Sequence, residues 1–364
     1  MYTKKKFPFK GMISWTRRDI YKFIIISTVP VILFSIFNLK FLQLPWLPIA
    51  LLGTAVVFIG GFKNNASYDR LWEARKIWGG IVNTSRSWGI MVRDYICNNH
   101  AHDKLSEEEL RKEQLIIINR HIAWMAAHRY ALRTKKSWES FENTHSDKEY
   151  KDRFIIIDEH QKPLEEALKP YLSSEELIYV MSKKNKATTL ISLQSKHIKE
   201  LKDRKLIWEF SYLEMENLLV EMYTLQGKNE RIKNFPYPRQ FATLNYTFVL
   251  IFIVLLPFGI MGTFDKSGME LLNSFNGMEE GILKTVSQFI ANHFVWLTIP
   301  FCTIIAWVFN TIERIGTVSE NPFEGTPNDI PITSMSRGIE IDLLEMFDEE
   351  NIPENIPVHN DIQM

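Results

Sequence analysis

Three residues spaced four apart, Thr54, Phe58 and Phe62, are the first candidate for a functional site. Residues at this spacing lie on one face of an α-helix, so their side chains would form a row. Rows from several copies of the chain would enclose a narrow constriction, which is one known way of gating a channel. The same spacing also fits ordinary lipid-facing or core packing. The periodicity therefore proposes a pore neck without establishing it.

Polar residues come shortly after the three candidates in the sequence and could act below such a neck. Asn64 and Asn65 offer amide donors to an anion that loses water, although asparagine at such a junction also serves in local capping. Arg70 belongs to a segment, residues 63–94, with six Lys/Arg against three acids. This excess of positive charge would concentrate anions there. The alternative interpretation is a solvated helix face with internal ion pairs.

A single long element must carry all six residues. Residues 41–62 contain no charge, and an aromatic, charged helix pattern follows as far as Gly79 with no turn signal between. About 20 residues at ~1.5 Å rise cross a hydrocarbon core of ~30 Å. Charged residues from Lys63 onward would be costly in lipid. The pattern predicts one helix that passes from the membrane into water.

Three further runs predict membrane helices. One lies near residues 20–38 and is uncharged after Lys22; the other two are the uncharged runs between Arg239 and Asp265 and between Lys284 and Glu313. A polar loop at 264–284 would join the last two. The fold class expected is an all-α membrane protein with four transmembrane helices and a helical cytoplasmic domain. Its parts would be a basic interfacial N-terminus (1–18), membrane helices 1 and 2 (19–62), the cytoplasmic domain (63–239), membrane helices 3 and 4 (240–312) and an acidic cytoplasmic tail (313–364).

The distribution of Lys and Arg predicts the orientation. The N-terminus and the flanks of the middle domain are rich in Lys and Arg, whereas the two short connections carry few. By the positive-inside rule, both termini and the middle domain face the cytoplasm. We therefore expect a multi-pass protein of the cell membrane, the inner membrane in a Gram-negative cell.

The composition argues against several other classes of protein. The formal net charge is zero and no domain is basic, so no nucleic-acid partner is expected. The sequence holds no glycine-rich phosphate loop, G-x-S-x-G or H-E-x-x-H, so no enzyme is expected. Cys97 and Cys302 lack metal-ligand spacing, and His121 and His128 lack a third ligand. We expect neither a metal nor a cofactor.

Three separated motifs resemble the bacterial branch of the bestrophin family. They are GGFKNNASYDRLWEARKIWG from Gly60, ERIKNFPYPRQFATLNY from Glu230, which leads into LLPFGIMG, and ENPFEG from Glu320. The resemblance covers most of residues 15–330. It implies a homopentameric ion channel in a lipid bilayer, with one central pore that chiefly passes chloride and other small anions.

The family resemblance also implies particular sites. The family's neck is lined by three apolar residues on the second membrane helix, and these fall on Thr54, Phe58 and Phe62; Thr54 departs from the usual bulky aliphatic residue. Animal bestrophins cage calcium with a run of acids after NPF, where this chain has only Glu324 and Asp329, a poor set for a hard cation. In the family the C-terminal segment wraps onto a neighbouring subunit. The apolar anchors for such docking would be Ile339, Leu343, Leu344 and Phe347.

Two other functions remain open at this point. Phenylalanine rings do not choose the sign of an ion unaided, so a cation-selective channel of the same family is the first alternative. The second is a non-conducting, membrane-anchored helical scaffold whose acidic tail binds partners.

Overall fold

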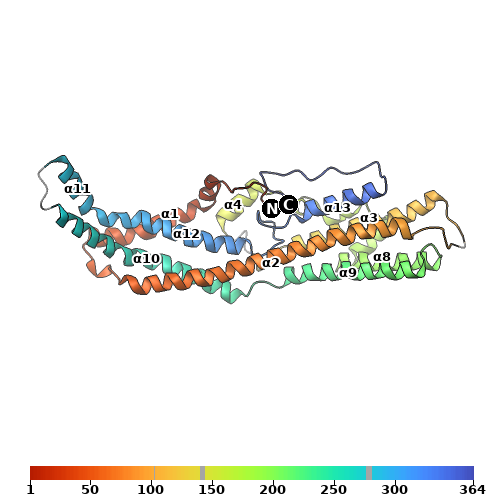
Figure 1. The fold of residues 1–364 in the computed structure, drawn as a ribbon, viewed down its shortest axis with the longest axis horizontal. Coiled ribbons are helices and arrows are strands. Elements are labelled where there is room, and N and C mark those ends of the chain that lie inside the picture. The colour runs from red at the N-terminus through yellow and green to blue at the C-terminus, as the bar shows by residue number, and fades with distance from the viewer. Residues whose placement is uncertain (102, 140–143, 276–280) are drawn as a thin grey trace.

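The computed structural model describes residues 1–101, 103–139, 144–275 and 281–364. Helices make up most of these residues and form one elongated body (Figure 1). Its axis is α2, Trp46–Tyr95, a helix of 50 residues that is about 75 Å long at 1.5 Å per residue. The prediction that one helix continues from the uncharged run into the charged segment is confirmed.

The first bundle packs against one side of the N-terminal half of α2. Its long helices are α1 (Phe9–Ser35), α10 (Arg239–Ser274) and α12 (Thr298–Val318), and its short ones are η1 (Lys40–Leu42), α11 (Ile282–Asn292) and η2 (Phe294–Leu297). Its core is apolar and includes Phe23, Val56 and Leu256. Gly53 lets α10 approach α2 closely, because a Cβ at that position would lie 2.7 Å from Phe252 Cε2.

Three helical segments of this bundle are long and apolar enough to cross a membrane: Lys40–Tyr95, Arg239–Ser274 and Phe294–Val318. The chain is thus an all-α membrane protein. α1 is not among the three. Its apolar part begins after Lys22 and the helix ends at Ser35, which is shorter than the roughly 20 residues of a crossing. A fourth crossing through α1 stays a prediction.

The second bundle packs around the C-terminal half of α2. Its helices are α3 (Glu107–Arg133), α5 (Asp158–Gln161), α6 (Leu164–Leu168), α7 (Ser174–Met181), α8 (Lys186–Asp203), α9 (Glu209–Asn234) and α13 (Ile332–Met346). The remaining helix, α4 (His145–Phe154), packs against α1 of the first bundle. Three tryptophans, Trp78, Trp88 and Trp124, are buried at its centre. α3 begins at a capping box formed by Ser106 and Glu109, which satisfies its first amide groups.

Two expected boundaries near the far end of the first bundle were wrong. α10 does not stop before Asp265 but continues to Ser274. The last uncharged run is three pieces, α11, η2 and α12, with the break at Asn292 and His293. The expected loop at 264–284 therefore shrinks to the stretch between α10 and α11, of which residues 276–280 lie outside the described residues. An uncharged run of sequence is compatible with lipid, but its ends need not coincide with the ends of a helix.

The C-terminal segment docks on its own chain; its expected contact with a neighbouring subunit stays a prediction. α13 packs against α2 and α3, with Ile339, Leu343 and Phe347 in the core of the second bundle. Gly89 makes room for it, because a Cβ there would lie 2.6 Å from Leu343 Cδ2. The last residues then run back beside α13 and bring the two termini together (Figure 1).

Candidate functional site

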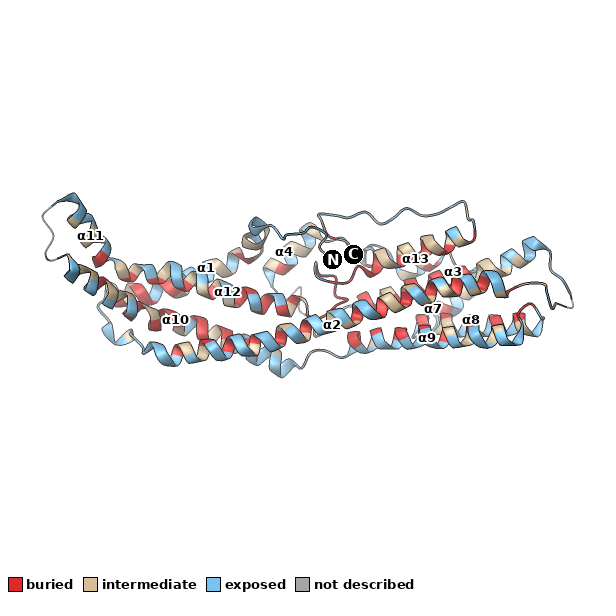
Figure 2. Cartoon of the chain, viewed as in Figure 1, coloured by how far each residue is buried: buried red, intermediate tan, exposed pale blue. Residues whose placement is uncertain are grey.

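One face of α2 is left uncovered by the rest of the chain along most of its length (Figure 2). Its exposed residues recur at helical spacing, and we call them the α2 stripe: Leu51, Thr54, Phe58, Phe62, Asn65, Asp69, Trp72 and Lys76. The opposite face, which includes Val56, Gly60 and Ser67, is buried. The stripe changes from apolar to polar at Asn65. An uncovered face that follows one helix through both bundles is the main candidate for a functional surface.

The three predicted neck residues lie together on the stripe. Phe58 is 67% exposed and Phe62 61% exposed. Their rings meet edge to face, with centroids 4.8 Å apart at 83°, an arrangement that aromatic pairs favour. Thr54 donates its hydroxyl to the carbonyl of Ala50 at 3.0 Å, within its own helix. The predicted common face is therefore present, and it is a largely apolar surface.

The three residues predicted below the neck do not act together. Asn65 is exposed on the stripe. Asn64 faces α12, where its Oδ1 would lie 2.0 Å from a Cβ at Gly316. Arg70 donates to three backbone carbonyls, those of Glu320 at 2.9 Å, Phe235 at 2.9 Å and Ile232 at 3.0 Å. Arg70 thus joins the ends of α9 and α12 to α2.

Lys63 belongs to the packing of α2 against α12 and not to the positive field below the neck. We counted it in the positive field below the neck, but it is 2% exposed and lies on the buried face of α2. Its Nζ is 2.6 Å from Glu313 Oε1 and 2.5 Å from Thr317 Oγ1 on α12. Nearby, Ser67 donates to the carbonyl of Gly316 at 2.9 Å. These contacts fix how α2 is rotated against α12, and hence which face forms the stripe.

The positive charge near the stripe is smaller than the sequence suggested. Arg86 pairs with Asp342 at 2.7 Å, and Arg93 pairs with Asp94 at 2.7 Å. Of the six basic residues in 63–94, Arg75 and Lys76 are exposed and have no ion-pair partner among the described residues. The uncompensated positive charge at this level thus comes from the exposed Arg75 and Lys76 and from Arg70, which only carbonyls bind, and it is opposed by the exposed carboxylate of Asp69.

In the loop after α12, the carboxylate of Asp329 binds groups of the same loop and of α3. Asp329 accepts hydrogen bonds from the amide of Gly325 and the hydroxyl of Thr326, both at 2.6 Å. It also pairs with buried Arg133 at 3.0 Å. Gly325 adopts φ +95°, a conformation that favours glycine. Across the described ranges, no three His, Cys, Asp or Glu side chains are arranged to hold a metal ion. Asp329 holds this loop against α3.

An all-α membrane protein whose exposed membrane helix continues into a second helical bundle is the class that these features define. The family model for the Bacterial/Fungal Bestrophin protein matches residues 9–272 and 288–345. The chain belongs to this family, so the assignment made from three motifs is confirmed.

Curated relatives and solved structures agree with the family assignment. The chain is 24% identical over 310 residues to the voltage-dependent anion channel-forming protein YneE of Escherichia coli K12, covering 85% of this chain and 79% of that protein. It is 23% identical over 330 residues to YneE of Salmonella typhimurium, covering 90% and 86%. A crystal structure of a bacterial bestrophin homologue from Klebsiella pneumoniae superposes with a TM-score of 0.67 at 20% identity, covering 91% of this chain and 98% of that one. The fold is shared with that structure.

Proposed function

We propose that this chain is the pore-forming subunit of a homopentameric ion channel that lets small monovalent anions such as chloride cross the membrane passively. The observation that carries the proposal is the α2 stripe, an exposed face that runs unbroken from Leu51 to Lys76. One chain has too few membrane helices to enclose an aqueous path, so other copies must complete the wall. The relatives named as voltage-dependent anion channel-forming proteins support the choice of anions.

Thr54, Phe58 and Phe62 form the neck in this proposal. Repeated around a central axis, the two phenylalanines of each copy would make apolar rings that exclude water when narrow. The edge of an aromatic ring is partly positive, so ring edges turned toward the axis favour an anion. Asn65 follows directly below and offers an amide donor. Arg75 and Lys76 supply the positive field further along the stripe.

The proposed topology keeps the expected division of the chain. Residues 1–18 lie at the interface, 19–62 and 240–312 contain four membrane helices, and 63–239 form a cytoplasmic domain to which the tail from 313 adds α13. Both termini are cytoplasmic. The ion pair between Lys40 and Asp265, at 3.4 Å, would mark the outer surface of the membrane. The uncovered sides of the bundles would meet lipid or neighbouring copies.

A cation channel is the second candidate, because of one specific residue. Asp69 is exposed on the stripe and would form a ring of five carboxylates in a pentamer. Such rings are typical of cation-selective pores. Arg75 and Lys76 outnumber it and lie within two turns, which favours the anion channel.

The proposal is tested with purified protein in liposomes. We expect native mass spectrometry to give five copies and a chloride-sensitive dye to report efflux that empty liposomes lack. A pentamer that passes neither chloride nor potassium would contradict a channel and favour the scaffold. A monomer with no larger assembly would remove the basis for the pore.

A further inference from the structure

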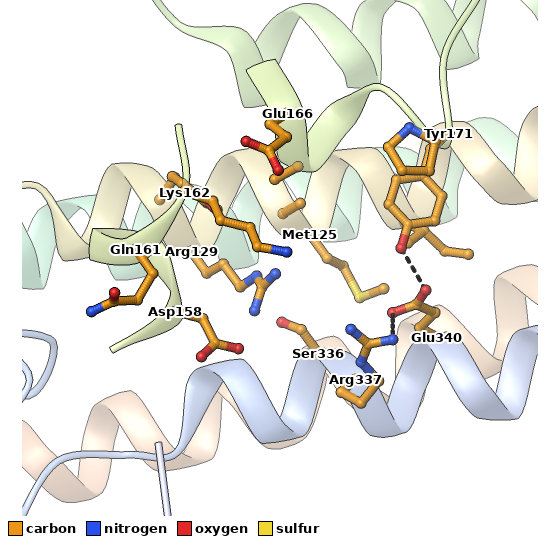
Figure 3. A pocket seen from close by; sticks show the side chains of 15 residues that line it. Met125, Arg129, Asp158, Gln161, Lys162, Glu166, Tyr171, Ser336, Arg337 and Glu340 are labelled. Atoms are coloured by element: carbon orange, nitrogen blue, oxygen red, sulfur yellow. Dashed lines mark hydrogen bonds and ion pairs between the residues drawn. The ribbon is translucent and has the colours of Figure 1, made fainter. Parts of the chain in front are cut away.

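The second bundle contains a polar cavity of about 350 Å³ that the proposed ion path does not use (Figure 3). Three parts of the chain line it. α3 contributes Arg129, the segment from α5 to Tyr171 contributes Lys162, and α13 contributes Ser336 and Arg337. Figure 3 shows the side chains of Arg129, Lys162 and Ser336 directed into the same space. The volume suits a small molecule.

Two buried donors in this cavity have no hydrogen-bond partner among the described residues. Arg129 Nη1 lies 3.1 Å from Glu159 Oε1, but its Nε is unpaired. Ser336 is 6% exposed, and its hydroxyl is also unpaired. Buried polar groups nearly always have a hydrogen-bond partner, because a buried polar group without a hydrogen bond costs free energy. Two such donors beside one cavity are available to a molecule that accepts hydrogen bonds.

The opposite wall is already satisfied by its own contacts. Tyr171 donates its hydroxyl to Glu340 at 2.5 Å, and Arg337 Nη1 lies 3.3 Å from the other oxygen of Glu340. Burial and this hydrogen bond raise the pKa of Tyr171, so its hydroxyl stays protonated at neutral pH. The charge of Glu340 is therefore balanced within the wall. The open side of the cavity carries the exposed residues Asp158, Lys162 and Glu166.

We propose that this cavity binds the oxyanion group, a carboxylate or a phosphate, of a small metabolite. Arg129 Nε and the Ser336 hydroxyl donate to the group at the base of the cavity, and Lys162 covers it from the rim. Charge-assisted hydrogen bonds of this kind are about twice as strong as neutral ones. Asp158 and Glu166 at the rim disfavour a ligand with several negative charges and accept one that also carries an ammonium group.

Occupancy of this site would tie α3 to α13. α13 also packs on α2, where Leu343 lies against Gly89. A ligand that bridges α3 and α13 therefore stabilises the docking of α13 on the helix that carries the stripe. The binding site itself does not depend on whether the chain conducts ions.

The test measures binding to purified full-length protein in detergent. Inorganic phosphate and acetate are titrated separately, with sodium chloride at equal ionic strength as the baseline, and followed by the unfolding temperature and by calorimetry. We expect saturable binding of at least one probe, and the probe that saturates at lower concentration identifies the group as phosphate or carboxylate. Ser336→Ala should raise the Kd about tenfold or more, because a hydrogen bond to a charged group is lost. Lys162→Ala should raise it up to about fivefold, as for an exposed charge.

Lys199→Ala provides the matched control, because Lys199 is an exposed lysine of the same bundle that does not line the cavity. It should bind both probes as the wild type does. Absence of saturable binding of either probe to the wild type would overturn the proposal and leave the cavity to water. Saturable binding that Ser336→Ala and Lys162→Ala both leave unchanged would also overturn it, because the probe would then bind elsewhere.

Discussion

Lys63 and Glu313 form a buried ion pair between α2 and α12, with Nζ 2.6 Å from Oε1 and both side chains almost inaccessible to solvent. Phe62, the next residue along α2, is exposed on the stripe. Consecutive residues of a helix point about 100° apart. The ion pair therefore holds Phe62 and its neighbours away from the first bundle and toward the proposed pore.

Breaking this ion pair should be strongly destabilising. Lys63→Met leaves the Glu313 carboxylate buried without its cation, and such a loss typically costs about 3–5 kcal/mol. We expect a much lower unfolding temperature or no assembled protein. Adding Glu313→Leu should restore most of the stability, because the unpaired charge is gone.

Arg93→Ala is the matched control, since it breaks an exposed pair with Asp94 on the same helix. It should change stability little. If Lys63→Met were as well tolerated as Arg93→Ala, the ion pair would not fix the rotation of α2.

The neck predicts a gain of conductance on truncation. Phe62→Ala removes the exposed ring that meets Phe58 edge to face, so the constriction widens and holds water more readily. We expect a larger basal current per channel in planar bilayers. Val57→Ala is the control, an exposed apolar residue 100° around the helix from Phe58. Currents that respond equally to both substitutions would contradict the assignment of the neck.

Conductance should not depend on micromolar calcium. The two acids that directly follow the NPF motif are Glu324 and Asp329, and Asp329 already accepts from Gly325, Thr326 and Arg133. A site with so few free oxygens would bind calcium only near ~10⁻³ M or more weakly. Currents recorded with micromolar calcium and with chelator should coincide. A steep response between them would mean that ligands come from elsewhere in the assembly.

The second bundle should lose stability in acid through His121 and His128. Burial lowers the pKa of each to about 3, against about 6.5 in the unfolded chain. Between pH 6.5 and 3 the unfolded chain binds protons that the folded chain does not, so stability falls as pH falls. The slope approaches ~1.4 kcal/mol per pH unit for each histidine.

Tryptophan fluorescence during urea unfolding at several pH values measures this slope, because Trp78 and Trp124 flank His128. His128→Phe should reduce the slope by one histidine's share. Met125→Leu, a buried change that does not titrate, should leave it intact. Equal slopes in the wild type and His128→Phe would refute the effect.

Local patterns were enough to predict several features of the chain. The continuity of α2 and the common face of Thr54, Phe58 and Phe62 follow from spacing along one helix, which sequence records directly. The family follows from motifs that are themselves continuous segments. These features involve residues close together in the chain.

The misjudged features depend on contacts between distant segments. Lys63 and Arg70 looked like pore-side cations, but Glu313 and the carbonyl of Glu320 bind them from about 250 residues away. The apolar face of α13 is visible in the sequence, yet the same face fits its own α2 or a neighbour's equally well. The space at Gly89 shows how Leu343 fits against α2, but a neighbour's α2 offers the same space.

The reversal potential of the purified channel in asymmetric potassium chloride tests the central claim most directly. If the α2 stripe lines an anion pore with Arg75 and Lys76 below the neck, the potential should lie close to the equilibrium potential of chloride. Reversing the charge at one stripe position with Lys76→Glu should move the reversal potential toward the equilibrium potential of potassium. A wild-type potential near that of potassium, or no current from intact pentamers, would contradict the account.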